Sequence, residues 1–221
     1  MIKLSKRLQA VADLVDPDCY LADVGSDHAM LPIYLLQKGT IKWVQAIENK
    51  MAPYLRMKGN IEGAGFSSHV LCTLGDGLTS LSPEVTGLTI CGIGGLLTCQ
   101  ILEKDPSKLQ NIHSIILDPH RDLVAVRQRV SQLHFHLIDE TMVYEDKIYY
   151  SIMKWAPGDP VRPYSEDELL FGPFLMLKKG EIYKDYIKDQ RQKVNAILNG
   201  GLPKEKREYY LNLYRRITAQ L

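Results

Sequence analysis

The chain lacks the features that mark several classes of protein. Its four cysteines form no Cys-x-x-Cys pair and no zinc-ligand spacing; they are Cys19, Cys72, Cys91 and Cys99. No apolar run approaches the roughly 18–20 residues needed to cross a bilayer, and the first residues lack the apolar core of a signal peptide. We therefore expect a cytoplasmic protein with reduced thiols, no metal site and no membrane association.

A strong net charge is also missing. The formal net charge is +1, and from Pro157 onward 12 Lys and Arg stand against 9 Asp and Glu, which is a mild excess. Charge alone therefore indicates no partner, because a nucleic-acid site requires cations gathered on one face. The 221 residues, 45% of them hydrophobic, suffice for one α/β domain with a small appendage.

Apolar runs of strand length alternate with helix-like segments along the first part of the chain. These runs lie at 20–24, 43–47, 69–73, 88–91 and 114–117. Such alternation predicts a parallel sheet with right-handed crossovers. The later runs 136–143 and 147–155 flank a turn and predict an antiparallel hairpin. The expected fold is α/β: a Rossmann-like, mostly parallel seven-stranded sheet that ends in an antiparallel hairpin, as in class I methyltransferases.

The segment 156–160, Ala-Pro-Gly-Asp-Pro, interrupts any regular structure and predicts a boundary. We expect a sheet domain over residues 1–156 and a helical arm over 157–221. Within the arm, periodicity predicts helices at 175–198 and 204–221 around a Gly-Gly-x-Pro turn. The predicted seam between them comprises Ile182, Tyr186, Ile197, Leu198, Leu211, Tyr214, Ile217 and Leu221.

The most informative motif is Asp23-Val24-Gly25-Ser26-Asp27-His28, which follows the first predicted strand, while Glu48 ends the second. This is the layout of a nucleoside-binding βαβ unit, with an acid placed for ribose hydroxyls. Asp27 occupies the position where a dinucleotide site needs its second glycine, and a carboxylate there would repel phosphates. The loop favours a nucleoside cofactor with a positive centre, which describes S-adenosylmethionine. The alternative is an ordinary helix start capped by Asp27.

Two glycine motifs follow the third and fourth predicted strands. In Gly75-Asp76-Gly77 the acid could accept a hydrogen bond from an adenine amino group, although the same residues also suit a simple turn. In Gly92-Ile93-Gly94-Gly95 the bare backbone could lie against the reacting methyl group and its acceptor. Close helix packing is the competing explanation for these glycines.

The segment after the fifth strand reads Asp118-Pro119-His120-Arg121. Asp118 and His120 could contact substrate or take up a proton, and Arg121 could hold a phosphate. A polar loop start explains the residues equally well. The chain also lacks an Asn-Pro-Pro-Tyr element of the kind found in many exocyclic-amine methyltransferases, which favours a ring nitrogen as methyl acceptor.

Together these motifs resemble the bacterial TrmK family of tRNA (adenine-N1)-methyltransferases, which modify adenine 22 in the D-arm. The segments that carry the resemblance are 4–8, 22–29, 31–35, 74–77 and 92–95. The sequence departs from the family pattern at Met30, Ile93 and Ala52. A further departure is Asp118-Pro119-His120, where the family usually has Gln-Pro-Asn.

The resemblance implies methylation of tRNA by a chain that uses S-adenosylmethionine. Adenine N1 carries an in-plane lone pair and needs no prior deprotonation, so Asp118 is expected only to take the amino proton afterwards, with His120 beside it. The expected cofactor-binding residues are Asp23, Gly25, Ser26, Asp27, His28, Glu48, Asn49, Gly75, Asp76, Gly77 and Gly92. The expected tRNA-binding residues are Lys6, Arg7, Gly94, Gly95 and Arg121.

The altered loop after strand five leaves two alternatives open. The first is a methyltransferase of the same fold that acts on another RNA or on a small molecule. The second is a tRNA-binding protein without turnover. A nicotinamide enzyme is disfavoured because of Asp27. The sequence favours a monomer.

Overall fold

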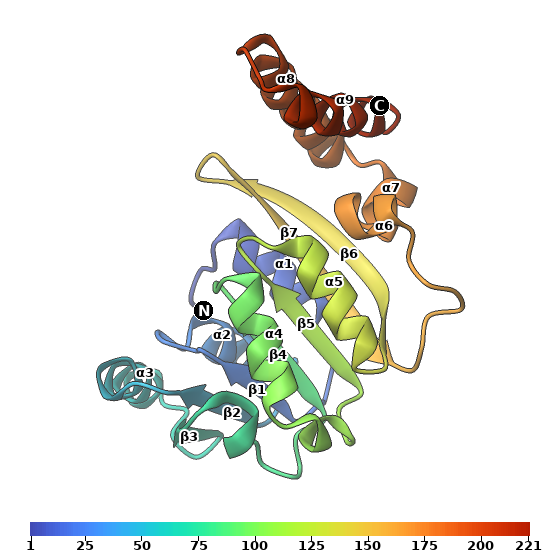
Figure 1. The fold of residues 1–221 in the computed structure, drawn as a ribbon. Coiled ribbons are helices and arrows are strands. Elements are labelled where there is room, and N and C mark those ends of the chain that lie inside the picture. The colour runs from blue at the N-terminus through green and yellow to red at the C-terminus, as the bar shows by residue number, and fades with distance from the viewer. The chain divides into compact units, whose positions relative to one another are not determined.

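The computed structural model describes residues 1–221, which divide into two compact units, Met1–Tyr164 and Ser165–Leu221 (Figure 1). The last strand of the first unit ends at Pro157. The segment that follows is tied to this unit, because the Tyr164 hydroxyl accepts a hydrogen bond from the Leu137 N–H at 2.9 Å. No helix in the structure is long and apolar enough to cross a membrane.

The first unit is built on a seven-stranded sheet, as predicted. Its strands are β1 Leu21–Val24, β2 Val44–Glu48, β3 Val70–Leu74, β4 Gly87–Cys91, β5 Ser114–Asp118, β6 Phe135–Glu145 and β7 Ile148–Pro157. They lie in the order β3-β2-β1-β4-β5-β7-β6. The first five are parallel, and β7 and β6 form the antiparallel hairpin that closes the sheet.

Helices cover both faces of this sheet. They are α1 Lys6–Leu14, α2 Met30–Lys38, α3 Met51–Gly63, α4 Gly95–Lys104 and α5 Leu123–Gln132, with short 3-10 turns η1 Gly77–Ser80 and η2 Pro106–Leu109. Figure 1 shows α4 and α5 in front of the sheet and α1 and α2 behind it. Buried side chains of α1, α2 and α3 join one core cluster with β1 and β2.

Burial explains why the strands read as continuous apolar runs. Every residue of β1, β2 and β5 is buried, because a parallel strand with helices on both faces has no solvent side. The edge strand β3 differs: of its residues only Val70 is buried.

The N-terminal helix is fastened to the β6–β7 hairpin. Ser5 caps α1 by accepting a hydrogen bond from the Leu8 N–H. Two further N–H groups, those of Lys6 and Arg7, donate to the carboxylate of Glu145 at 2.7 and 3.2 Å. An anion at a helix N-terminus interacts favourably with the helix dipole, so Glu145 fixes where α1 begins.

The second unit is wholly helical. Its helices are α6 Glu166–Phe171, α7 Pro173–Lys178, α8 Glu181–Asn199 and α9 Lys204–Thr218. The predicted single helix over 175–198 is wrong: Lys179 adopts a left-handed conformation at φ 45°, and Gly180 is the N-cap of a new helix that begins at Glu181. Ser165 and Glu168 form a capping box that begins α6, a Ser-x-x-Glu signature present in the sequence.

The predicted seam of the helical hairpin is also partly wrong. The buried positions of α8 are Tyr183, Ile187, Val194 and Leu198, whereas Ile182 and Ile197 are exposed. Leu198 of α8 and Ile217 of α9 are buried as expected, whereas the predicted Leu211 and Leu221 are exposed. Apolar residues stand next to one another at 182–183 and 186–187, so periodicity alone allowed the stripe to be placed one residue away.

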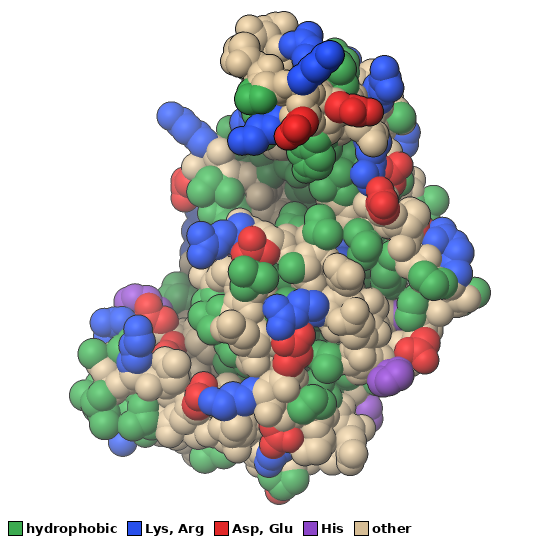
Figure 2. Space-filling view, viewed as in Figure 1, with side chains coloured by type: hydrophobic (Ala, Val, Ile, Leu, Met, Phe, Trp, Pro, Cys, Tyr) green, Lys and Arg blue, Asp and Glu red, His purple; other side chains and the backbone are tan.

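Figure 2 shows positive and negative side chains interspersed over the visible face of the first unit. One pair is instead fully buried: Arg127 Nε donates to Glu140 Oε1 at 2.9 Å, with side-chain exposures of 1% and 0%. Arg127 Nη2 also reaches the Ser151 hydroxyl at 3.3 Å. The neighbouring pair of Arg129 and Glu103 is about one-third exposed.

The two pairs on α5 should differ sharply in their effect on stability. Glu140→Ala leaves the Arg127 guanidinium buried without its carboxylate, so we expect a loss of about 3–5 kcal/mol in the free energy of unfolding. Glu103→Ala should cost less than about 1 kcal/mol, because water replaces the lost partner of Arg129. Urea denaturation of both variants measures the difference, and equal losses would contradict this assignment.

Candidate functional site

A cavity of about 400 Å³ opens at the carboxyl ends of β1, β2 and β4. Strand order reverses here, because β1 pairs with β2 on one side and β4 on the other. Open α/β sheets bind ligands at such switch points. The lining residues are Val24, Gly25, Asp27, Ile47, Glu48, Asn49, Lys50, Pro53, Gly75, Asp76, Gly77, Cys91, Gly92, Ile93, Leu97 and Ile101.

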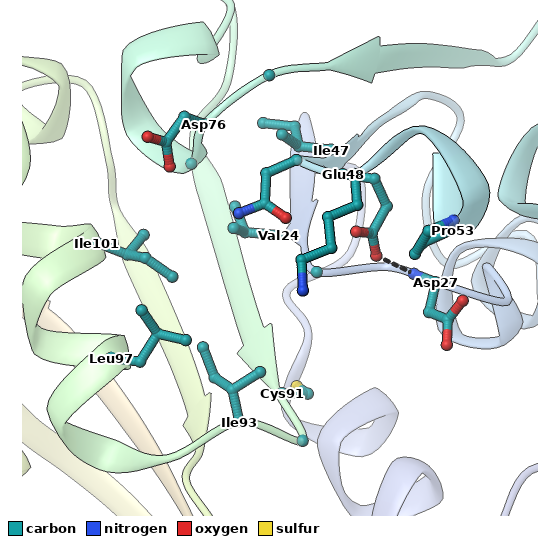
Figure 3. Close-up of a pocket in the computed structure, with 16 residues that line it drawn as sticks. Val24, Asp27, Ile47, Glu48, Pro53, Asp76, Cys91, Ile93, Leu97 and Ile101 are labelled. Atoms are coloured by element: carbon teal, nitrogen blue, oxygen red, sulfur yellow. Dashed lines mark hydrogen bonds between the residues drawn. The ribbon is translucent and has the colours of Figure 1, made fainter. Parts of the chain in front are cut away.

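Glu48 is the acid at the end of β2. Its side chain is largely buried, and Oε1 accepts a hydrogen bond from the Asp27 N–H at 2.5 Å (Figure 3). The same carboxylate borders the cavity. Glu48 thus joins β2 to the loop after β1 and presents an acceptor to a ligand.

The loop after β1 adopts an unusual backbone. Gly25 has φ +78° and donates its N–H to the Ile47 carbonyl at 2.9 Å. Asp27 and Ala29 also have positive φ, at 37° and 54°. Helix α2 begins after Ala29 without a side-chain cap, so Asp27 is not the helix cap that the alternative reading required.

Helix α3 holds this loop in place. Arg56 donates to Asp27 Oδ1 from Nε and Nη2 at 3.0 and 2.6 Å. One turn later, Asn60 Nδ2 donates to the His28 carbonyl at 3.0 Å. Positive φ values cost energy for residues other than glycine, and these contacts offset that cost. Sequence reasoning missed both residues, because nothing in α3 itself points to the loop.

Asp23 lies at the inner end of the same loop. Its carboxylate is 5% exposed and accepts hydrogen bonds from the Ser26 and Thr89 hydroxyls at 2.6 and 2.7 Å. Burial raises its pKa, and the nearby Glu48 adds to the rise. Asp23 borders a second cavity of about 260 Å³, which shares Gly25, Asp27, Cys91 and Gly92 with the first and is otherwise lined by Arg7, Leu8, Asp23, Ser26, His28, Met30 and Leu31.

The Gly75-Asp76-Gly77 turn follows β3 as expected. A side chain at either flanking glycine would force a neighbour to shift, because a Cβ on Gly75 would lie 2.0 Å from the Ser80 hydroxyl oxygen and one on Gly77 would lie 2.9 Å from Ile101. Asp76 borders the first cavity and forms an ion pair with Lys104 of α4. Its carboxylate is more than half exposed, so it keeps room for a ligand.

Sequence reasoning also missed the apolar wall of the first cavity. Figure 3 shows Ile93, Leu97 and Ile101 along one side, opposite Glu48 and Pro53. Leu97 is 50% exposed. The sequence did hold a signal for this wall. Apolar residues directly follow the glycine motif, in the first turn of a helix, where they can face a ligand.

The loops after β4 and β5 are hydrogen-bonded to each other. The Gly92 N–H donates to the Asp118 carbonyl at 3.1 Å, and the His120 N–H donates to the Ile93 carbonyl at 2.9 Å. Gly92 has φ +76° and lines both cavities. A Cβ on Gly95 would lie 2.4 Å from the Arg121 carbonyl oxygen, so close helix packing already requires that glycine.

Asp118 is completely buried and paired with Arg7 of α1. Its Oδ2 accepts from Arg7 Nη1, while Oδ1 is buried without a hydrogen-bond partner. Burial raises the pKa of Asp118 to about 6, although Arg7 acts in the opposite direction. The Arg7 guanidinium also lies 5.4 Å from the ring centre of Tyr150, and the His120 ring lies 5.4 Å from the same ring.

The structure therefore gathers the residues that sequence motifs singled out. All of the expected cofactor residues line one of the two adjoining cavities. Of the expected tRNA contacts, Lys6 and Arg121 are exposed, with Arg121 beside Gly94. Arg7 instead points inward to Asp118, and only 19% of its side chain is exposed.

Comparison with known proteins agrees with this geometry. A family model described as a methyltransferase domain matches residues 4–153. A Bacillus subtilis tRNA (adenine(22)-N(1))-methyltransferase is 35% identical over 187 residues, which cover 82% of this chain and 79% of that protein.

Solved structures extend the similarity over the whole chain. A Streptococcus pneumoniae protein in complex with S-adenosyl-L-methionine is 30% identical with a TM-score of 0.92, covering 99% of this chain and 100% of that one. The B. subtilis M1A22 tRNA methyltransferase TrmK is 29% identical with a TM-score of 0.89, covering 100% of this chain and 99% of that one. This chain belongs to the TrmK family of tRNA (adenine(22)-N(1))-methyltransferases.

Proposed function

We propose that this protein transfers a methyl group from S-adenosylmethionine to N1 of adenine 22 in tRNA. The observation that carries the proposal is its similarity to the B. subtilis enzyme along most of the chain. The two adjoining cavities at the switch point of the sheet supply a site with the chemistry that this reaction needs.

The larger cavity fits a nucleoside. Glu48 offers a carboxylate to ribose hydroxyls, and Asp76 offers one to an adenine amino group. Ile93, Leu97 and Ile101 supply an apolar wall for the ring. The glycines at 75 and 77 keep the backbone close to the cavity, where any side chain would collide with Ser80 or Ile101.

The smaller cavity fits the amino-acid end of the cofactor. Asp23 and Arg7 border it and carry opposite charges, which suits an ammonium and a carboxylate. Asp23 accepts hydrogen bonds only from hydroxyl groups in the structure, so its charge is not matched by a protein cation. When bound, S-adenosylmethionine supplies an electrophilic methyl group on a sulfonium.

The methyl acceptor is expected at the glycine loop that both cavities share. Adenine N1 is nucleophilic without deprotonation, so the protein has to hold the ring in line and exclude water. His120 is exposed beside Gly92, and its Nε2 would lie 3.9 Å from a Cβ at that glycine. Burial lowers the pKa of His120, and Arg7 acts in the same direction. A neutral imidazole there can take up the amino proton after methylation.

Asp118 has a different task in this proposal. Oδ2 is held by Arg7 and Oδ1 is buried, so the carboxylate is not accessible for contact with a base. It positions Arg7 instead, so that the guanidinium stays at the smaller cavity and over Tyr150. Asp118, which the sequence suggested as a proton acceptor, therefore acts as a positioning residue.

We also propose that the protein works as a monomer in the cytoplasm, where its tRNA substrate is found. Light scattering after size exclusion should give a mass near the 25.1 kDa of one chain. A mass twice that value would contradict the monomer.

The proposed reaction is tested with labelled S-adenosylmethionine and unmodified tRNA transcripts. Incorporation should occur in the transcript with adenine 22 and disappear when guanine replaces that single base. Mapping the product should place the methyl group at N1. Equal incorporation in both transcripts, or none in either while the cofactor binds, would overturn the proposal.

Activity should depend on pH through Asp118. Its pKa of about 6 means that the carboxylate is ionised and paired with Arg7 above pH 6, and that the pair is lost as pH falls through 6. We expect kcat/KM to fall below about pH 6, which gives the pH profile an acid limb. His120→Asn should retain this limb, because Asp118 still titrates, and adding Asp118→Asn to that variant should give a low rate without it. An acid limb that survives in the double variant would contradict this role.

The hydrogen bonds by which α3 holds the loop after β1 should affect cofactor binding selectively. Arg56→Ala removes the hydrogen bonds to Asp27, and we expect KM for S-adenosylmethionine to rise about 3- to 10-fold with kcat nearly unchanged, as expected for about 1 kcal/mol at a half-exposed site. Lys58→Ala on the same helix is the control, because Lys58 pairs only with Glu62, in an exposed i,i+4 pair at 3.9 Å. Equal effects of the two substitutions would contradict the role of Arg56 in holding the loop for cofactor binding.

A further inference from the structure

The β6–β7 hairpin extends well beyond the end of its neighbour β5 (Figure 1). In the sheet register Leu117 of β5 is opposite Met153, whereas β7 begins at Ile148. About four residues of β7 therefore project past the end of β5, which corresponds to roughly 13 Å at about 3.3 Å per residue. The carboxyl end of β5 borders the site, so this projection forms a wall beside it.

One face of the projecting hairpin contacts residues at the site and the start of α1. Tyr150 packs against His120 and Arg7, and Glu145 accepts the N–H groups of Lys6 and Arg7. The hairpin tip is thereby held within direct contact of residues that frame the smaller cavity.

The opposite face of the tip carries a pair of tyrosines. Tyr144 and Tyr149 are cross-strand partners, and their ring centres lie 4.6 Å apart at an interplanar angle of 40°. Side chains alternate between faces along a strand, so this pair faces away from Tyr150. Tyr144 is 44% exposed, which leaves part of an aromatic face in water.

The charged groups at the tip suit an RNA chain. Glu145 is engaged at the start of α1, while Lys147 is exposed and takes part in no ion pair. Lys6, whose N–H contacts Glu145, is also exposed. Asp146, at the turn, is exposed as well and carries a charge of the opposite sign to these two lysines. The tip thus combines aromatic faces with cations for phosphates, as sites for single-stranded nucleic acid do.

We propose that the Tyr144–Tyr149 pair is a stacking platform for a base of tRNA next to the target adenine. The proposal rests on the proposed tRNA substrate. An enzyme that takes a base out of its stack leaves the neighbouring base with an uncovered face. The hairpin tip lies beside the site where the target must enter, so the exposed tyrosine ring can cover that face.

The decisive variant is Tyr144→Ala, compared with Tyr144→Phe. We expect Tyr144→Ala to raise both the Kd and the KM for tRNA by roughly 5- to 100-fold, the range that stacking on one aromatic ring supplies. Tyr144→Phe keeps the ring and should stay within about twofold of the original protein. The KM for S-adenosylmethionine should remain unchanged in both. Tyr144→Ala should lower the thermal midpoint by no more than a few degrees, because the ring is partly exposed and the pair with Tyr149 contributes only about 1 kcal/mol.

The chain offers a matched control in a second exposed aromatic pair. Tyr20 and Trp43 have ring centres 5.7 Å apart, and Tyr20 is 50% exposed. Tyr20 precedes β1 and so lies at the amino edge of the sheet, away from the site. Tyr20→Ala should leave the Kd for tRNA unchanged.

The outcomes separate this proposal from the proposed function. If the unaltered protein methylates adenine 22 and Tyr144→Ala binds tRNA equally well, the platform is overturned and the function stands. Equal losses in Tyr20→Ala and Tyr144→Ala also overturn it. A change of mass in light scattering, with tRNA affinity intact, would show that the pair contacts a second copy of the chain. Failure of the unaltered protein to bind any tRNA overturns both proposals.

Discussion

The reversal of strand order at β1 (Leu21–Val24) is the constraint on which the site depends. Because β1 lies between β2 and β4, the loops that leave these strands diverge and open a cavity between them. Three strand ends then deliver Gly25, Glu48 and Gly92 to the same edge of the sheet. Each of these residues is local to its own strand, and only the parallel arrangement makes them neighbours.

Charges around the cavities follow a simple arrangement. Three acids are paired with cations: Asp27 with Arg56, Asp76 with Lys104, and Asp118 with Arg7. Asp23 and Glu48 accept hydrogen bonds only from hydroxyl or backbone N–H groups. Negative charge without a protein counterion is therefore concentrated at the centre of the site. A cofactor with an ammonium, a sulfonium and ribose hydroxyls can use it.

The N-terminal helix and the hairpin act as one element beside this centre. Glu145 fixes the start of α1, α1 carries Arg7, and Arg7 reaches Asp118 at the end of β5. Tyr150 contacts both Arg7 and His120 from the same hairpin. A tRNA that touches the hairpin tip would therefore bear on the element that holds Arg7 at the smaller cavity. If the proposed roles of the hairpin and of Arg7 hold, tRNA binding and cofactor binding both depend on the position of α1.

The sequence by itself determined the sheet and singled out most of the residues that line the two cavities. Runs of buried residues such as those of β1 and β5 are readable because helices cover both faces of a parallel strand. The motifs around Asp23 and Glu48 are readable because their spacing along one βαβ unit fixes their separation. Patterns of this kind can be recognised within a short segment, without knowledge of the rest of the chain.

Tertiary structure decided what depends on contacts between distant segments. The Arg7–Asp118 pair spans 111 positions, and no local pattern links the two residues, so a residue predicted to contact tRNA is instead the partner of a buried acid. Arg56 reaches Asp27 from another helix for the same reason. In the second unit, adjacent apolar residues allowed two helical stripes, and only tertiary packing buried Tyr183 and left Ile182 exposed. Periodicity shows that a face is apolar, whereas burial depends on which neighbour covers it.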